Sequence, residues 1–509
     1  MINFWESSVW GFILLLSVLL VTILVANILK RTIPFFKNSL IPTSVLAGGM
    51  ILIVSIAYTL IIENVGNLSE TMPKNLFELS VFGNYGSATN EDGATVPITG
   101  INILEVVTYH SLALGFIATA FKPDSAKLTK KRSIEVFDTG VTTVSTYLLQ
   151  GALGLGITLL FPMLVGGFTA AGLILPFGYG QGTGQALNYG KIYEGLGFSN
   201  GSSFGLTIAA LGFLSASIGG VIHLNITKRK LKKKLGSVED DDEEIPMENV
   251  QAKGDSPMEG SVDKFSIQIG IVLLTYLIAY GAMYLIGLLL PGMRATIYGF
   301  NFLFGVLFAS LVNHIVKRLR IRRVMKKQYI NSFLMKRVAG FFFDLMVVSG
   351  IASIQFEALR QYWLSFIIIG VLGAVVTYFY LRVVCKKLFP SYVEEQFLMM
   401  YGMLTGTAST GLILLREQDN HLETPAADNM VYQNLPAIVF GFPLLFIATF
   451  APSSPENPYN TIIAFGIVVA FFAVLNIILF RKWIFKKKKK KDAVEIVTEP
   501  NSESSESVE

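Results

Sequence analysis

The chain has 509 residues, of which 52% are hydrophobic and only 15% are charged, and its mean hydropathy is +0.55. Soluble proteins are about 25% charged, and a single soluble core stops growing near roughly 250–300 residues. This composition argues against soluble enzymes and nucleic-acid-binding proteins and predicts an all-α polytopic membrane protein. The single cysteine, Cys385, excludes an intramolecular disulfide framework and a cysteine-cluster metal site.

Apolar blocks of about 20 residues recur along the chain, long enough to cross a bilayer as helices. The first, Val9 to Leu29, has no basic residue before it and is followed by Lys30 and Arg31, which predicts an uncleaved helix whose N-terminus lies outside. With the blocks that follow, the chain is expected to cross the membrane about eleven times. The further spans are expected at about 39–62, 101–121, 134–161, 202–224, 266–290, 297–316, 338–359, 364–384, 435–451 and 461–485.

The basic residues follow this topology. The predicted inner segments hold 36 of the 41 Lys and Arg, and the predicted outer segments hold three. Because cytoplasmic loops are enriched in Lys and Arg, this split predicts a multi-pass protein with a cytoplasmic C-terminus. The expected location is the cell membrane of a bacterium. The net charge of +5 matters less than this distribution. The two remaining basic residues, Lys191 and Arg416, lie in two apolar stretches that are not predicted to cross the membrane as single continuous helices.

Two apolar segments are interrupted by glycine and proline. The first, at about 162–200, contains Gly178-Tyr179-Gly180-Gln181-Gly182-Thr183-Gly184, and the second, at about 389–434, contains Gly406-Thr407-Ala408-Ser409-Thr410. By the charge distribution the first opens outward and the second inward. Each is therefore predicted to be a re-entrant hairpin, because non-helical backbone at membrane depth is tolerated only inside protein or beside a water-filled cavity.

The two halves of the chain repeat one another. An offset of 224 places Gly182-Thr183 on Gly406-Thr407, and an offset of 234 places residues 109–119 on 343–353. Because one half starts outside and the other inside, the repeats are predicted to be inverted, as in secondary transporters. The expected divisions are residues 1–225 (first repeat), 226–264 (charged cytoplasmic linker), 265–451 (second repeat), 452–485 (an extra membrane helix) and 486–509 (a disordered cytoplasmic tail).

These motifs resemble the sodium/glutamate symporter family over most of residues 9–451. The non-helical tips of the two predicted hairpins are Gly182-Thr183 and Gly406-Thr407, here named the first and second tip. The resemblance is carried by these tips, the first leading to Gly190-Lys191, and by two further motifs, Leu40-Ile41-Pro42 with Gly48-Gly49 and Gly115-Phe116-Ile117-Ala118-Thr119. It implies sodium-coupled uptake of glutamate by an elevator motion, a homodimer, and a substrate site shared by the hairpins and neighbouring helices. Gln181 departs from the family, which often has His at this position, so the identity of the substrate is open.

The expected site is built from the tips. Sodium needs several oxygen ligands, which hydroxyl groups and turned backbone carbonyls supply, and the helix N-termini after each tip suit a carboxylate. The candidates for substrate binding are Gln181, Gly182, Thr183, Gly184, Thr407, Ala408, Ser409, Arg416 and Asp344. The candidates for Na⁺ binding are Thr183, Gly406, Thr407, Ser409, Thr410, Thr119 and Ser353.

Four ionisable residues have alternative interpretations. Arg416 is either a partner for a substrate carboxylate or a topology anchor beside Glu417, and Lys191 could face the outer surface beside Glu194. Asp344 and His110 occupy corresponding positions in the two repeats, where an ionisable group is a functional candidate or else pairs with other polar groups.

Other functions remain open at this point. The nearest is a sodium- or proton-coupled carrier of another small carboxylate. A membrane enzyme built on His110, Asp344 and Glu357 is less favoured, because no metalloprotease, paired-Asp or P-loop motif is present, and the same absence disfavours ATP-driven transport. The sequence therefore predicts a transporter and not an enzyme, with no partner other than substrate, Na⁺, lipid and a second copy of the chain.

The charge split generates a test of topology. In a Cys385→Ser background, Asp240→Cys is expected to react with a membrane-permeant thiol reagent and to resist an impermeant one added to intact cells. Labelling of position 240 by the impermeant reagent in intact cells would contradict the topology and, with it, the inverted repeat.

Overall fold

The fold is seen in a computed structural model that describes residues 4–38, 40–65, 72–83, 85–89, 95–121, 129–231, 263–325, 328–419, 424–452 and 458–481. These ranges are mostly helical, and the segment before residue 100 adds a small antiparallel sheet of β1 (Ser87–Thr89) and β2 (Thr95–Pro97). Most of the predicted charged linker and the whole predicted disordered tail lie outside the described residues.

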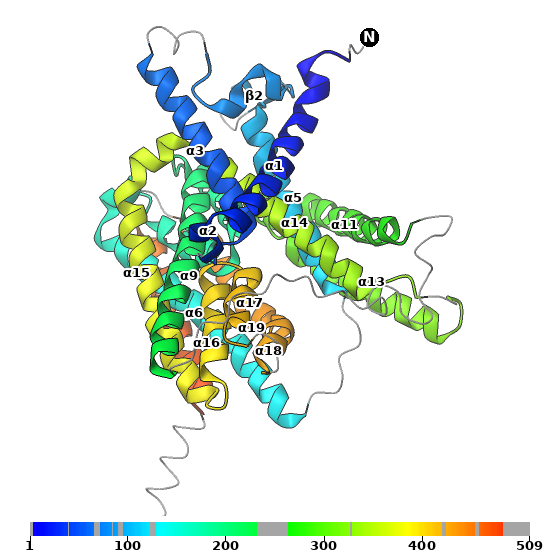
Figure 1. The fold of residues 1–509 in the computed structure, drawn as a ribbon, viewed down its shortest axis with the longest axis vertical. Coiled ribbons are helices and arrows are strands. Elements are labelled where there is room, and N and C mark those ends of the chain that lie inside the picture. The colour runs from blue at the N-terminus through cyan, green and yellow to red at the C-terminus, as the bar shows by residue number, and fades with distance from the viewer. Residues whose placement is uncertain are drawn as a thin grey trace, which may run out of the picture.

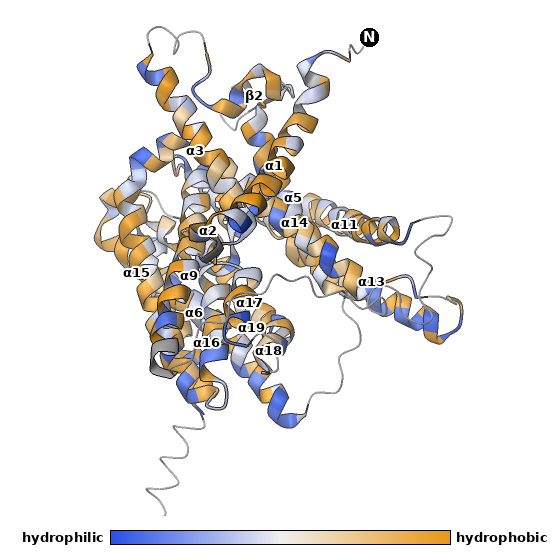
Figure 2. Ribbon diagram, viewed as in Figure 1, coloured by the Kyte–Doolittle hydropathy of each residue, from blue (hydrophilic) through white to orange (hydrophobic). Residues whose placement is uncertain are grey.

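Long apolar helices confirm the membrane character of the chain (Figure 2). Within the described ranges nine helices are long and apolar enough to cross a membrane, and a bent helix pair at Ala426–Phe450 raises this to as many as ten. The predicted span at 338–359 corresponds to α14 (Ser332–Ala352), which is not among them and carries Lys336, Arg337 and Asp344. The count of eleven therefore stays a prediction.

The helices form two groups. The first, here named the crossed group, is centred on the packing of α5 against α14, and its outer helices extend upward and to the right in Figure 1. Two short helices, α2 and α12, and short 3₁₀ turns join its members. Its elements are α1 (Ser7–Thr32), α2 (Pro34–Asn38), α3 (Thr43–Asn64), η1 (Leu76–Glu78), η2 (Ser80–Phe82), α5 (Gly100–Ala120), α11 (Lys264–Leu289), η5 (Pro291–Met293), α12 (Arg294–Gly299), α13 (Asn301–Ile321) and α14.

The second group, here named the broken-helix group, contains both glycine-interrupted segments. In each of them two helices fold back on one another: rings of Phe177 and Tyr189 stack at 4.0 Å, and Gly402 packs on Gly411. Its elements are α6 (Lys130–Leu160), η3 (Pro162–Val165), η4 (Thr169–Leu173), α7 (Ile174–Gln181), α8 (Thr183–Gly195), α9 (Gly201–Leu231), α15 (Phe356–Leu388), α16 (Val393–Thr405), α17 (Ala408–Arg416), α18 (Ala426–Tyr432), α19 (Asn434–Phe450) and α20 (Tyr459–Leu479).

Helix contacts recur in equivalent pairs between the two halves of the chain. The contact of α1 with α3 has its counterpart in α11 with α13, and that of α3 with α14 in α13 with α5. In the broken-helix group, α6 packs on α7 as α15 packs on α16, and α9 packs on α15 as α19 packs on α6. The contacts thus follow the order of the sequence repeat, in which residues 109–119 of α5 align with 343–353 of α14.

Helix starts follow local chemistry. Residues with short polar side chains stand immediately before several helices, where a side-chain oxygen accepts from the free backbone N–H groups of the first turn. Asp263 accepts from Ser266 N at 3.0 Å, Asn331 from Leu334 N at 2.9 Å, and Thr407 from Thr410 N at 3.5 Å. The start of α17 at the second tip is therefore encoded by Thr407 itself.

Close approach of backbones in the broken-helix group depends on glycine. A Cβ atom on Gly154 of α6 would lie 2.0 Å from the carbonyl oxygen of Gly172 in η4. Two residues further along α6, a Cβ on Gly156 would have Phe465 as its nearest neighbour at 3.8 Å. The first glycine is thus required by packing and the second is not.

This difference predicts opposite effects of one substitution. Gly154→Ala is expected to lower the melting temperature of the purified protein by several degrees, because α6 must separate from η4. Gly156→Ala, the matched control, is expected to leave it unchanged or raise it, since Ala is favoured over Gly in helices by about 1 kcal/mol. Equal melting temperatures for the two variants would show that the contact between Gly154 and Gly172 contributes nothing to stability.

Candidate functional site

The tips of the two interrupted segments meet. Gly182 separates α7 from α8 with φ +85°, a left-handed conformation that favours glycine, and Gly406 separates α16 from Thr407 and α17. A Cβ on Gly182 would lie 3.4 Å from Thr407 Cγ2 and 3.9 Å from the Gly406 carbonyl oxygen. Two motifs 224 residues apart in sequence thus come into direct contact.

The first tip is enclosed by the crossed group. Thr183 is fully buried and donates a hydrogen bond to the carbonyl oxygen of Met346 in α14 at 3.4 Å. A Cβ on Gly184 would press on Leu112 of α5 at 2.7 Å, and one on Gly350 would lie 3.0 Å from Thr183 Cβ. Ser353 is also on this side, since it donates to Gly350 O at 3.0 Å. Gln181, the last residue of α7, is half-buried.

The second tip is more open. Gly406 and Thr410 are buried, and the hydroxyl oxygens of Thr407 and Thr410 are 3.3 Å apart. Ala408 and Ser409, which form the first turn of α17, are exposed. The second tip therefore presents a helix N-terminus and hydroxyl groups on an accessible face.

Two predicted residues lie away from the tips, and a third pairs with another helix. Arg416 is exposed at the last position of α17, about 13 Å along the helix from Thr407. Thr119 donates to its own helix at Phe116 O, about 10 Å along α5 from Leu112. Asp344 shares a hydrogen bond with Ser44 at the start of α3. These placements favour the alternative interpretations of Arg416 and Asp344, as an anchor and as a polar pair between helices.

The proposed enzyme residues do not form a cluster. His110 lies 2.7 Å from the hydroxyl of Tyr276, between Nδ1 and Oη, while Asp344 is bonded to Ser44. Across the described residues, no group of three or more His, Cys, Asp or Glu side chains is arranged to hold a metal ion. The geometry therefore brings the two tips together and leaves these residues in separate places.

Sequence analysis missed two buried glutamines beside the tips. Gln150 of α6 donates to the carbonyl oxygen of Leu404 at 2.9 Å and to Thr377 Oγ1 at 3.0 Å, so it joins α6 to α15 and α16. Gln185 lies in the first turn of α8, is 1% exposed, and neither its amide oxygen nor its amide nitrogen has a hydrogen-bond partner among the described residues. The only signal in the sequence was an amide within an apolar stretch.

An ion pair joins the two helix groups. Lys191 Nζ in α8 lies 3.0 Å from Glu105 Oε2 in α5 and 3.3 Å from Glu194 Oε2. The Glu105 side chain is 8% exposed, whereas Lys191 is 46% exposed. Lys191 thus pairs with Glu194, its neighbour in the sequence, and also with the buried Glu105. The pair with Glu105 joins α8 to the crossed group.

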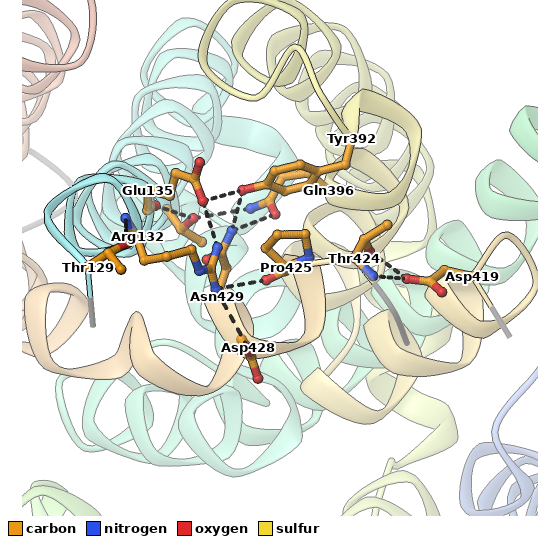
Figure 3. A network of polar contacts seen from close by, with 11 residues as sticks. Thr129, Arg132, Glu135, Tyr392, Gln396, Asp419, Thr424, Pro425, Asp428 and Asn429 are labelled. Carbon is orange, nitrogen blue, oxygen red and sulfur yellow. Dashed lines mark hydrogen bonds and ion pairs between the residues drawn. The ribbon is translucent and has the colours of Figure 1, made fainter. Parts of the chain in front are cut away.

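A polar network surrounds the N-terminal end of α16, the first helix of the second interrupted segment (Figure 3). Glu135 of α6 accepts from Arg132 at 2.6 Å and from the Tyr392 hydroxyl at 3.1 Å, and Asn429 of α18 donates to Tyr392 and Gln396. Gln396 in turn donates to Thr139 of α6 at 3.2 Å. The network therefore anchors α16 and α18 to the first turns of α6.

A second cluster lies at the start of α16. Glu394 accepts two hydrogen bonds from Arg382 at 2.7 and 2.6 Å, and its Oε2 is 2.7 Å from His223 Nε2. Burial raises the pKa of Glu394, but the hydrogen bonds from His223 and Arg382 outweigh it and lower the pKa to about 2. The carboxylate therefore joins α9, α15 and α16 as an anion.

No protein-family model matches the chain, and no similar curated protein was found.

The low pKa of Glu394 predicts a pH-dependent loss of stability. A carboxyl group whose pKa is lower in the folded state stabilises the fold above its unfolded pKa, and this contribution disappears as the pH falls through the folded pKa. Glu394→Gln is expected to lower the melting temperature at pH 7. The difference from wild type should shrink between pH 4.5, the ordinary value, and about pH 2. A difference that stays constant over this range would exclude an ionised Glu394 as its source.

Proposed function

We propose that the chain is a sodium-coupled secondary transporter that imports glutamate or a similar anionic amino acid by an elevator-type alternating-access mechanism. The observation that carries the proposal is the meeting of two Gly-Thr helix breaks, one from each half of the chain. The resemblance of the motifs to sodium/glutamate symporters supplies the substrate class and the coupling ion.

The paired helix contacts support an inverted repeat. Every major contact of the first half named above has a counterpart in the second, and the helices that pair with their own counterparts, α5 with α14 and α6 with α15, lie where a pseudo-two-fold axis would pass. Together with the charge split, which starts one half outside and the other inside, this fits the plan of secondary transporters, in which the broken segments are re-entrant hairpins.

The division into two groups supports an elevator motion. The broken-helix group carries both tips and is the moving part of the proposal, and the crossed group is the fixed part. Their contact is unequal: α8 packs against α5, α14 and α12, whereas the main contacts of α17 are with α16, α9 and α18. The site is therefore closed on the side of the first tip and open on the side of the second, which the charge distribution assigns to the cytoplasm.

The chemistry of the tips suits an anionic substrate. The helices α8 and α17 both begin at the tips, so their free N–H groups and positive dipole ends face the junction. A carboxylate can be held there by Thr407, Ala408 and Ser409 without a buried arginine. Gln181, in place of the histidine often found in the family, leaves another small carboxylate as the second candidate substrate.

The proposal places the protein in the cell membrane as a homodimer with a cytoplasmic C-terminus and no catalytic activity. Its partners are the substrate, sodium and the bilayer, with no nucleic acid and no prosthetic group. Sodium is the coupling ion and is transported together with the substrate.

Uptake into proteoliposomes tests this function. Labelled glutamate is expected to accumulate with external sodium, to accumulate faster with an inside-negative potassium-diffusion potential, and to stay outside when choline replaces sodium. One sodium ion per glutamate would be electroneutral, so acceleration by the potential requires at least two; each net charge gains about 2.3 kcal/mol per 100 mV. Thr183→Val and Thr407→Val, which remove a hydroxyl at nearly constant volume, are expected to reduce uptake at least tenfold.

Thr275→Val is the matched control for these variants. Thr275 is a fully buried threonine of the crossed group that donates to its own helix at Ile271 O, 2.7 Å away, so its loss should leave uptake near wild type. Uptake that proceeds equally in choline would reject sodium coupling. Wild-type rates for both tip variants would show that the tips are structural.

A further inference from the structure

The orientation of the Gln150 amide is determined by its neighbours. Its nitrogen lies 2.9 Å from the Leu404 carbonyl oxygen, which can only accept a hydrogen bond, so the nitrogen and not the oxygen must face Leu404. Both N–H groups are then used, on Leu404 and on Thr377 Oγ1. Oε1 points the other way. It is shielded from solvent, and none of the described residues donates to it.

Gln150 Oε1 lies near the C-terminal end of α7. A Cβ on Gly180, in the last turn of α7, would lie 3.4 Å from Gln150 Oε1. The Leu404 carbonyl belongs to the last turn of α16, so one side chain of α6 reaches the C-terminal ends of both α7 and α16. Helix C-termini carry carbonyl groups without intrahelical partners and the negative end of the helix dipole.

One carbonyl at these helix ends accepts a hydrogen bond from another side chain of α6. Tyr147, one turn before Gln150, donates from its hydroxyl to Gly180 O at 3.1 Å. The side chains of α6 thus supply donors to each helix end and leave one oxygen, Gln150 Oε1, unsatisfied between them. A buried polar atom without a partner lowers the stability of the fold, and a ligand that binds it restores that stability.

The ligand that fits this position is a cation. An anion would be repelled by the helix C-termini and would find no donor, because the N–H groups of Gln150 are occupied. In transporters built from broken helices, sodium is coordinated by unwound backbone carbonyls and half-helix C-terminal ends, and an amide oxygen is a neutral acceptor of the same kind. The enclosed position favours a single ion over the ammonium group of a larger substrate.

We propose that Gln150 Oε1 and the C-terminal carbonyls of α7 bind one sodium ion. The site rests on the proposed function, in which sodium is the coupling ion, and it lies on the C-terminal side of the tips, whereas the hydroxyls of Thr183, Thr407 and Ser409 begin the helices on the N-terminal side. Sodium and the substrate anion therefore occupy opposite poles of the same helix breaks.

Two other side-chain amides, which pack near the start of α6, also leave a buried oxygen without a partner. Asn429 and Gln433 each use their amide nitrogen as a donor and leave a buried amide oxygen without a partner among the described residues. Both lie near the start of α6: Asn429 bonds to Gln396, the partner of Thr139, and a Cβ on Gly140 would be 2.9 Å from Gln433 O. These acceptors lie about 15 Å from Gln150 along α6.

Sodium-dependent thermal stability of the purified full-length protein tests the site without substrate. The melting temperature of wild type is expected to rise saturably with NaCl at constant total chloride, relative to choline chloride. Gln150→Met, which keeps the volume and removes the oxygen, is expected to raise the half-saturating sodium concentration at least tenfold. Gln268→Met is the matched control.

Gln268 is a fully buried glutamine of the crossed group whose amide is satisfied by Lys264 O, Tyr329 O and Asn331 N. Its replacement should lower the melting temperature in choline but keep the wild-type half-saturating sodium concentration. Gln150→Glu retains an oxygen at the site and is expected to keep a saturable sodium response, so it serves if Gln150→Met does not fold.

The outcomes separate this site from the function. A wild-type sodium response in Gln150→Met, or none in folded Gln150→Glu, would overturn the site while sodium-driven glutamate uptake by the wild type still supported the function. If Gln150→Met lost stabilisation by glutamate but kept that by sodium, the oxygen would bind the substrate ammonium group and the site would also be overturned. A sodium response that depends on Gln150, in a protein that takes up no glutamate, would support the site and reject the substrate.

Discussion

The structure depends on the cost of interrupting a helix in an apolar environment. Where α7 and α16 end at glycine, their last carbonyls lose intrahelical partners, and no water is at hand within a bilayer to replace them. The chain meets this cost with side chains of α6: Tyr147 donates to Gly180 O and Gln150 to Leu404 O. These hydrogen bonds join α6 to the ends of both α7 and α16.

Each helix break also separates charge. The C-terminal end of one half-helix and the N-terminal start of the next meet at the tip, so a negative and a positive pole lie on either side of one or two residues. Two such breaks in contact produce a cluster that can accept an anion on one side and a cation on the other without any buried charged residue. Among the described residues no cluster of three or more His, Cys, Asp or Glu side chains could hold a metal ion, which is consistent with recognition by dipoles and neutral oxygens.

The pairing of helix contacts between the halves is incomplete around the first interrupted segment. The first helix pair is held against the crossed group by the Glu105–Lys191 ion pair and by Thr183, whereas the first turn of α17 is exposed. A buried carboxylate that lost its partner would cost several kcal/mol. The ion pair therefore opposes separation of the two groups on this side, and any motion between them must offer Glu105 water or another partner.

Apolar blocks, glycine-rich interruptions and capping residues are local properties, so the sequence by itself determined the membrane class, the helices and the places where they break. The repeat further indicated that Thr183 and Thr407 are equivalent. Only the tertiary structure decided that their tips touch and that Arg416 and Thr119 lie far from them. It also decided that Gln150 lies beside the ends of α7 and α16 and that Glu105 pairs with Lys191 of α8. A lone glutamine or glutamate in an apolar segment must find a polar partner, but that partner comes from a distant helix whose packing the local sequence does not specify.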